Sequence, residues 1–273
     1  MLVSHPLTRF ISFTGSKEVG LRINELAARH QPGQIWIKRV VAEMGGKNGI
    51  IVDDEADLDA AALGVMVSAY GYQGQKCSAC SRAVIVNSIY DSFMEKLVAK
   101  AKGIKVGLPQ NQDTYMGPVI NLKAMAQIMD YIEIGKREHE LALGGDKIEG
   151  PGCFIEPTIF TGVPRNARIA QEEIFGPVLA VIRAEDFQDA LDIINGTEYG
   201  LTGSLYTKNH EKMAKAANEF HVGNLYFNRK STGAMVGGHP FGGFNMSGTD
   251  SKAGGKDYLL LFTQAKAISE KVA

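Results

Sequence analysis

Long apolar runs, blocks of one charge and an even set of cysteines are all missing from this 273-residue sequence. No uninterrupted apolar stretch approaches the roughly 20 residues that span a bilayer, and residues 1–5 lack the charged-then-apolar layout of a signal peptide. Lysine plus arginine number 29 against 30 for aspartate plus glutamate. Because no basic block with interleaved aromatics occurs, we expect neither nucleic acid nor an anionic membrane as a partner. A cytoplasmic protein is the expectation.

Cysteine is scarce, with three residues in the chain. An odd number in a chain of this length argues against a disulfide framework and for reduced thiols. Cys77 and Cys80 lie three positions apart, between the cations Lys76 and Arg82. The pair has several interpretations: buried small hydrophobes, half a zinc site, a redox pair, or a nucleophile of lowered pKa. Since Cys153 stands alone and no histidine pair has metal-binding spacing, we expect no metal site.

Hydrophobic residues make up 45% of the chain, enough for a sizeable core. Short β-branched or aromatic runs alternate with amphipathic stretches, which predicts an α/β fold with a mostly parallel sheet flanked by helices. Strands are expected at residues 9–14, 35–41, 50–52, 83–86, 154–160, 178–182, 203–206 and 224–227. Helices are expected behind an N-cap at Ser16, from about Ala56, over Ile89 to Ala101, and at 187–194 and 210–220.

Two more segments have candidate chemistry. The turn at residues 13–16 follows a predicted strand and opens a helix, where backbone N–H groups favour a phosphate, although most such turns only cap helices. Glu43 ends a predicted strand just before Gly45 and Gly46, where a carboxylate could serve as a base or could simply be exposed. Taken alone, neither segment decides the function.

Together these segments resemble the aldehyde dehydrogenase superfamily, whose members share a Phe-Thr-Gly-Ser turn, a Glu-x-Gly-Gly-Lys segment and a Gly-Gln-x-Cys segment in that order. The three occur at residues 13–16, 43–47 and 74–77. The similarity continues through residues 116–120, 154–158, 172–178 and 240–248, and so covers nearly the whole chain. It implies an aldehyde dehydrogenase-like catalytic domain, joined to the tail end of a Rossmann-like nucleotide-binding domain.

The resemblance implies roles for individual residues. Cys77 is the nucleophile rather than Cys80, because it directly follows Gly-Gln-x, and Glu43 is the general base. NAD is the implied cofactor, and the residues that face it are Gly15, Ser16, Glu173 and Phe175. The positions that would separate NAD from NADP are not found in this sequence, so NAD rests on the resemblance alone.

Residues 75–82 and 230–243 further resemble the subgroup that oxidises glutamate γ-semialdehyde to glutamate in proline breakdown. In that subgroup a hydroxyl and the backbone amides of an anchor loop hold the substrate carboxylate, here Ser78, Gly233 and Ala234. Phe241 would contact the aliphatic part of the substrate, although it is equally a packing residue. The implied partner is a small-molecule aldehyde.

The resemblance also divides the chain. Residues 1–45 match a C-terminal remnant of the NAD-binding domain, 46–245 the catalytic domain, and 246–273 a C-terminal segment with an oligomerisation arm near 264–272, which implies a homo-oligomer. The family's oxyanion asparagine, ribose-binding lysine and dimerising hairpin are not located. Three hypotheses stay open: a dehydrogenase fragment that is inactive by itself, which we favour, a complete minimal enzyme, and a non-enzymatic binding or assembly module.

Overall fold

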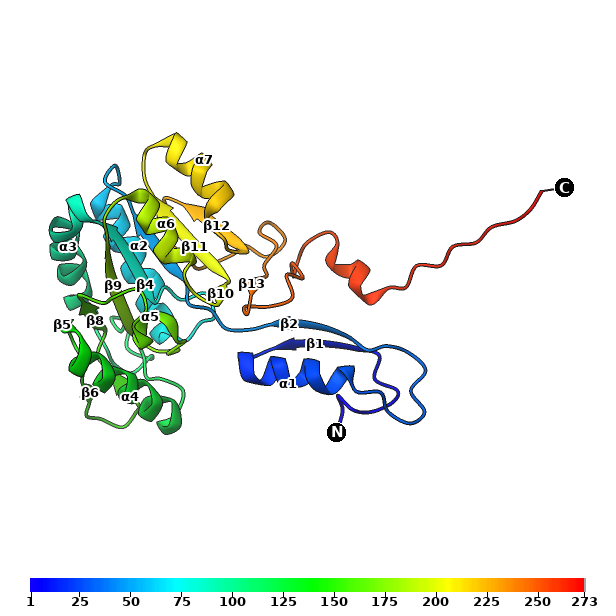
Figure 1. The fold of residues 1–273 in the computed structure, drawn as a ribbon. Coiled ribbons are helices and arrows are strands. Elements are labelled where there is room, and N and C mark those ends of the chain that lie inside the picture. Colours follow the sequence, from blue (N-terminus) through cyan, green and yellow to red (C-terminus); the bar gives the residue numbers. More distant parts are fainter. Residues whose placement is uncertain (273) are drawn as a thin grey trace.

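A seven-stranded sheet forms the centre of the computed structural model, which describes residues 1–272 (Figure 1). The strand order is β12-β11-β3-β4-β9-β8-β5, and only β5 runs antiparallel to its neighbour. The strands are β3 (Gly49–Val52), β4 (Arg82–Val86), β5 (Glu140–Leu143), β8 (Thr158–Thr161), β9 (Val178–Ala184), β11 (Thr202–Tyr206) and β12 (Asn224–Phe227). The predicted α/β fold with a mostly parallel sheet is confirmed.

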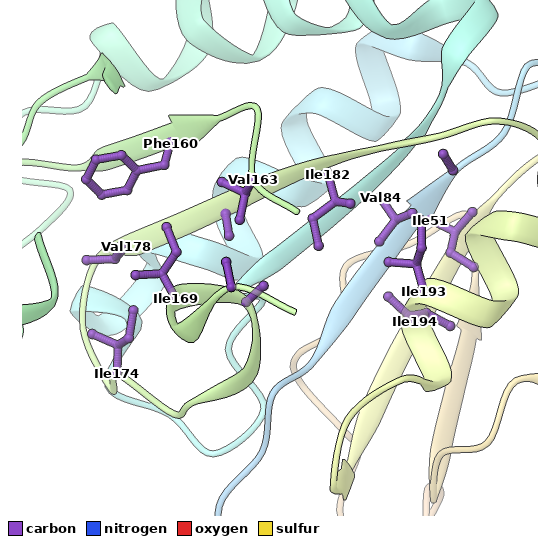
Figure 2. Close-up of a cluster of buried hydrophobic side chains, with 14 of the residues drawn as sticks. Ile51, Val84, Phe160, Val163, Ile169, Ile174, Val178, Ile182, Ile193 and Ile194 are labelled. Carbon is purple, nitrogen blue, oxygen red and sulfur yellow. The ribbon is translucent and has the colours of Figure 1, made fainter. Parts of the chain in front are cut away.

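Helices cover both faces of this sheet, because its central strands are apolar on both sides. Successive strand residues point to opposite faces, so Ile51 joins one buried cluster and Ile50 the other. Figure 2 shows the first cluster, in which Ile193 and Ile194 lie near Ile51 and Val84. The first cluster includes residues of α4 (Leu122–Glu138), α5 (Arg168–Gln171), α6 (Phe187–Asn195) and α7 (His210–Glu219), and the second those of α2 (Leu58–Tyr70) and α3 (Tyr90–Lys102).

A small lobe stands beside the sheet and consists of β1 (Phe10–Thr14), α1 (Lys17–Ala28) and β2 (Arg39–Glu43) (Figure 1). Its two strands pair in parallel, from Phe10 opposite Arg39 to Thr14 opposite Glu43. The chain enters the body directly after β2. The assignment of residues 1–45 to a nucleotide-binding domain stays a prediction.

Two expected strands differ in the structure, and three further elements were not expected. The second strand begins at Arg39 rather than at residue 35, since Ile35 and Ile37 pair with no strand and are 84% and 90% exposed. The strand expected at 154–160 is split into β7 (Phe154–Ile155) and β8, because Pro157 has no N–H for a strand ladder. Helix α4 and strands β5 and β6 (Lys147–Ile148) were not predicted.

The last part of the chain returns to the lobe. Strand β13 (Phe244–Asn245) pairs with β10 (Tyr199–Gly200), and the 3-10 helix η3 (Tyr258–Phe262) places the Phe262 ring centroid 4.5 Å from that of Phe10.

Residues 263–272 carry no helix or strand and extend away from the body (Figure 1), so the predicted oligomerisation arm is unpaired here. Residue 273 lies outside the described residues. Within residues 1–272, no helix has the length and apolar character to cross a membrane.

Candidate active site

A cleft of about 900 Å³ is lined by residues of both the lobe and the body. It brings together the predicted nucleophile Cys77 and all four residues predicted to face the cofactor: Gly15, Ser16, Glu173 and Phe175. Cys80 and Cys153, the other two cysteines, are not part of its lining. A groove of about 970 Å³ lies between α3 and the β5–β8 edge, but it contains none of the predicted site residues.

Cys77 lies in the loop that follows the 3-10 helix η1 (Gly71–Gly74), and it is half-buried with a free thiol. Burial and the nearby Glu173 raise the pKa of Cys77, whereas the backbone N–H of Ser78 lowers it. Cys80 is buried, and its Sγ donates to the Arg82 carbonyl at 3.2 Å. Burial raises the pKa of Cys80 to about 12. Of these two thiols, the one in the cleft is the one suited to react with a ligand.

Glu43 ends β2 and forms an isolated bridge to Gly248. Burial raises the pKa of its carboxyl to about 7, and the charge of Lys252 partly opposes this rise. Neither carboxylate oxygen has a hydrogen-bond partner among the described residues. Glu43 is not itself part of the cleft lining in this structure, although its charge reaches far enough to raise the pKa of Cys77. A carboxyl with a pKa near neutrality is suited to general base catalysis.

The segment after Glu43 brings the main chain against both Cys77 and Glu173. The Gly46 N–H donates to Glu173 Oε1 at 2.9 Å. A Cβ added at Gly45 would lie 2.1 Å from Glu173 Oε2, and one at Gly46 would lie 2.7 Å from the Cys77 carbonyl oxygen. Position 46 therefore needs glycine for this close approach, whereas a side chain at Gly45 would displace the Glu173 carboxylate.

The lobe contributes the N-terminus of α1 to the cleft. Ser16 caps this helix, with its Oγ accepting from the Val19 N–H at 3.4 Å, so the ordinary capping role is also present. The remaining N–H groups of the first turn and the helix dipole favour an anion such as a phosphate. Lys17 forms an ion pair with Glu198 of the body. Phe175, at the other side, has a φ of 58° and a side chain 44% exposed.

The residues predicted to hold the substrate are not all brought together. Ser78 lines the cleft, and its carbonyl accepts from Thr202 Oγ1 at 3.4 Å. Gly233 and Ala234 lie in the loop after β12, while Phe241 forms an isolated bridge with Ala253. Gly233, Ala234 and Phe241 are not among the described residues that line the cleft. Their substrate role stays a prediction.

Six cleft residues were not identified from the sequence: Lys17, Glu18, Gln127, Tyr131, Glu198 and Tyr199. Gln127 and Tyr131 are four residues apart on α4, so they lie on one face of a helix that was not predicted. Tyr131 Oη donates to Glu172 Oε2 at 2.6 Å. The apolar pair Ile128 and Ile132, with the same spacing, was the signal that could have revealed this helix.

Known proteins share both this sequence and this fold. Residues 1–268 match the aldehyde dehydrogenase family. The chain is 61% identical over 269 residues to 1-pyrroline-5-carboxylate dehydrogenases of Geobacillus sp. and Bacillus subtilis, covering 98% of this chain and 52% of each relative. The chain therefore spans about half the length of the curated relatives it matches.

Two solved structures show the same agreement. A 1-pyrroline-5-carboxylate dehydrogenase from Thermus with bound NAD has a TM-score of 0.97 and 55% identity, over 99% of this chain and 52% of that one. A betaine aldehyde dehydrogenase from Staphylococcus aureus in complex with NAD+ has a TM-score of 0.84 and 34% identity, over 90% of this chain and 48% of that one. The chain belongs to the aldehyde dehydrogenase family.

Proposed function

We propose that this chain carries the catalytic machinery for the NAD-dependent oxidation of glutamate γ-semialdehyde, which is in equilibrium with 1-pyrroline-5-carboxylate, to glutamate. The observation that carries the proposal is the shared cleft, which is lined by Cys77 together with the N-terminus of α1 and Glu173. The relatives named for this activity support the choice of substrate.

The residues around the cleft fit a dinucleotide. The first turn of α1 would provide N–H groups for phosphate, with Gly15 and Ser16 at its start, and the Glu173 carboxylate would accept from a ribose hydroxyl. Phe175 would contact the nicotinamide surroundings. When bound, NAD supplies the hydride acceptor.

The covalent steps belong to Cys77. Its thiolate adds to the aldehyde carbon, so that a C–S bond forms and the carbonyl π electrons move to oxygen. When the tetrahedral carbon loses its hydride, the C=O bond re-forms and a thioester remains on Cys77. Covalent capture thus makes hydride loss possible from a carbon that already bears an alkoxide.

Hydrolysis of the thioester requires a base. Glu43, with a pKa of about 7, accepts a proton from water as the water oxygen attacks the thioester carbon. The C–S bond then breaks, glutamate leaves, and the thiol of Cys77 is restored. For this step the Glu43 side chain has to turn toward Cys77, from its position beside Gly242 and Gly248.

NADH formation tests the proposal most simply. The chain and its Cys77→Ala variant would be mixed with NAD and 1-pyrroline-5-carboxylate, and the absorbance of NADH followed. NADH formation that is lost in Cys77→Ala supports the proposal, and formation that survives in the variant contradicts it. We expect slow or absent turnover from the isolated chain because the curated relatives are about twice as long, so the covalent step needs its own test, described at the end of the Discussion.

Self-association through residues 264–272 is a further part of this proposal. The segment is extended and unpaired, and its free backbone groups can add to the edge of another sheet. Removal of these residues is expected to lower the oligomeric state, as measured by light scattering. An unchanged mass would remove this part of the proposal.

A further inference from the structure

Asn48 is buried directly beneath the loop that carries the nucleophile, with 3% of its surface exposed. Its Nδ2 donates both to the Cys77 carbonyl at 2.7 Å and to the Ala79 carbonyl at 2.9 Å. Its Oδ1 accepts from the Thr202 N–H at 2.9 Å. Both the nitrogen and the oxygen of this side-chain amide are therefore hydrogen-bonded. The two donated bonds reach the carbonyls of Cys77 and Ala79, the residues on either side of Ser78.

The main chain of Asn48 holds the far end of the same loop. Its carbonyl accepts from the N–H groups of Ser81 and Arg82, each at 3.1 Å. The Arg82 guanidinium, itself buried, donates to the Lys47 carbonyl at 2.9 Å. The loop from Cys77 to Arg82 is thus fixed to one short segment, residues 47–48, that precedes β3.

The consequence for the nucleophile follows from the planarity of the peptide bond. The Cys77 carbonyl and the Ser78 N–H belong to one rigid peptide plane, so a bond that fixes the carbonyl also fixes the direction of the N–H. That N–H favours the thiolate form of Cys77. From the other side, the Gly46 main chain packs against the same Cys77 carbonyl, which leaves no room for a side chain there.

We propose that Asn48 is a positioning residue for the nucleophile: its side-chain amide holds the Cys77 and Ala79 carbonyls, and so fixes the loop that presents the Cys77 sulfur. The proposal rests on the proposed function only in naming Cys77 as the nucleophile. Asn48 touches neither the sulfur nor the cleft, so it acts through the loop and not on the substrate.

The test is the pH dependence of Cys77 alkylation by iodoacetamide, measured by peptide mass spectrometry on the full chain. In Asn48→Ala the profile is expected to move to higher pH, with alkylation roughly tenfold slower at a pH below the thiol pKa, because the Cys77 and Ala79 carbonyls lose their donor and the backbone beside the sulfur is no longer held in place. Asn48→Ser, which keeps one short donor, is expected to fall between this variant and the parent chain. Neither measurement requires NAD or aldehyde.

A matched control separates positioning from general loss of stability. Ile51→Val removes one buried methyl group from the adjacent strand β3 without a polar change, and should leave the alkylation profile where it is. An unshifted profile in folded Asn48→Ala overturns the proposal, as does an equal shift in Ile51→Val. If Asn48→Ala fails to fold, Asn48→Ser decides by the same criterion. NADH formation that survives in Cys77→Ala would overturn the proposed function and leave this result unaffected.

Discussion

The backbone N–H of Gly46 donates a 2.9 Å hydrogen bond to the carboxylate of Glu173. This contact joins the segment after Glu43 to the loop before β9, and both segments line the cleft. Burial raises the pKa of Glu173, and its negative charge in turn raises the pKa of Cys77. The Glu173 carboxylate and the Cys77 thiol are therefore electrostatically coupled.

Neutralising Glu173 should activate the thiol. In Glu173→Gln the amide oxygen can still accept from Gly46, but the charge that opposes Cys77 ionisation is gone, so alkylation of Cys77 should be faster at neutral pH. Glu18→Gln is the comparison, because Glu18 also lines the cleft but is not among the main causes of the shift of Cys77. Equal alkylation rates in Glu173→Gln and the parent chain would contradict this account.

Hydrolysis of an acylated Cys77 should depend on the ionisation of Glu43. An activated ester would acylate the thiol, and intact mass would follow the loss of the acyl group. The rate should fall as pH falls through about 7, because Glu43 becomes protonated, and Glu43→Gln should slow it by roughly 10²-fold or more. Glu43→Asp, which keeps a carboxyl, serves as the comparison. Unchanged hydrolysis in Glu43→Gln would exclude the base role.

Lys47 is expected to make stability depend on pH. It is 1% exposed, and its Nζ has no hydrogen-bond partner among the described residues. Burial lowers its pKa to about 7 from the 10.5 of a free lysine. Between pH 7 and 10.5 the unfolded chain holds a proton on Lys47 that the folded chain has lost. The destabilisation caused by Lys47 is therefore complete below about pH 7 and decreases as the pH rises toward 10.5.

Lys47→Met is the corresponding variant. It should raise the free energy of unfolding at pH 7 by roughly 1 kcal/mol or more, and the gain should shrink at about pH 9. Urea unfolding at both pH values measures it. Lys96→Met, which breaks an exposed ion pair with Asp59, should change stability little at either pH. A loss of stability in Lys47→Met at pH 7 would contradict this prediction, because it would mean that the buried amine stabilises the folded chain.

Packing of α4 on the sheet gives a prediction of stability alone. A Cβ at Gly135 would lie 2.5 Å from Cζ of the fully buried Phe160 ring. Gly135→Ala should therefore lower the free energy of unfolding by about 1–3 kcal/mol, despite the better helix propensity of alanine. Gly103→Ala is the control, since its Cβ would meet only a carbonyl at 3.4 Å. Thermal unfolding measures both variants, and a Gly135→Ala variant as stable as the parent chain would contradict this prediction.

The sequence predicted those parts of the site whose chemistry lies in a contiguous segment. The turn at 13–16, the segment at 43–47 and the loop at 74–77 each carry their own signal, and the structure brings all three together around the cleft or beside it. Most central strands were also predictable, because a strand buried on both faces is a short apolar run.

The remaining parts depend on contacts that no segment contains by itself. The strand expected to start at Ile35 needs a partner strand, and the structure provides none for residues 35–38. The role of Asn48 depends on carbonyls about thirty positions later in the chain. Gly233 and Ala234 lie in a largely exposed loop, where the Gly233 carbonyl accepts from the Arg229 guanidinium at 3.0 Å.

The central claim is that Cys77 adds to the aldehyde, and protection from alkylation tests it most directly. The chain would receive a short pulse of iodoacetamide with and without 1-pyrroline-5-carboxylate, and each cysteine would be followed by peptide mass spectrometry, with the half-buried Cys153 as an internal reference. The account predicts that Cys77 is alkylated, that the aldehyde slows this reaction, and that Cys153 is unaffected by the aldehyde. Alkylation of Cys77 at the same rate with and without the aldehyde would contradict it.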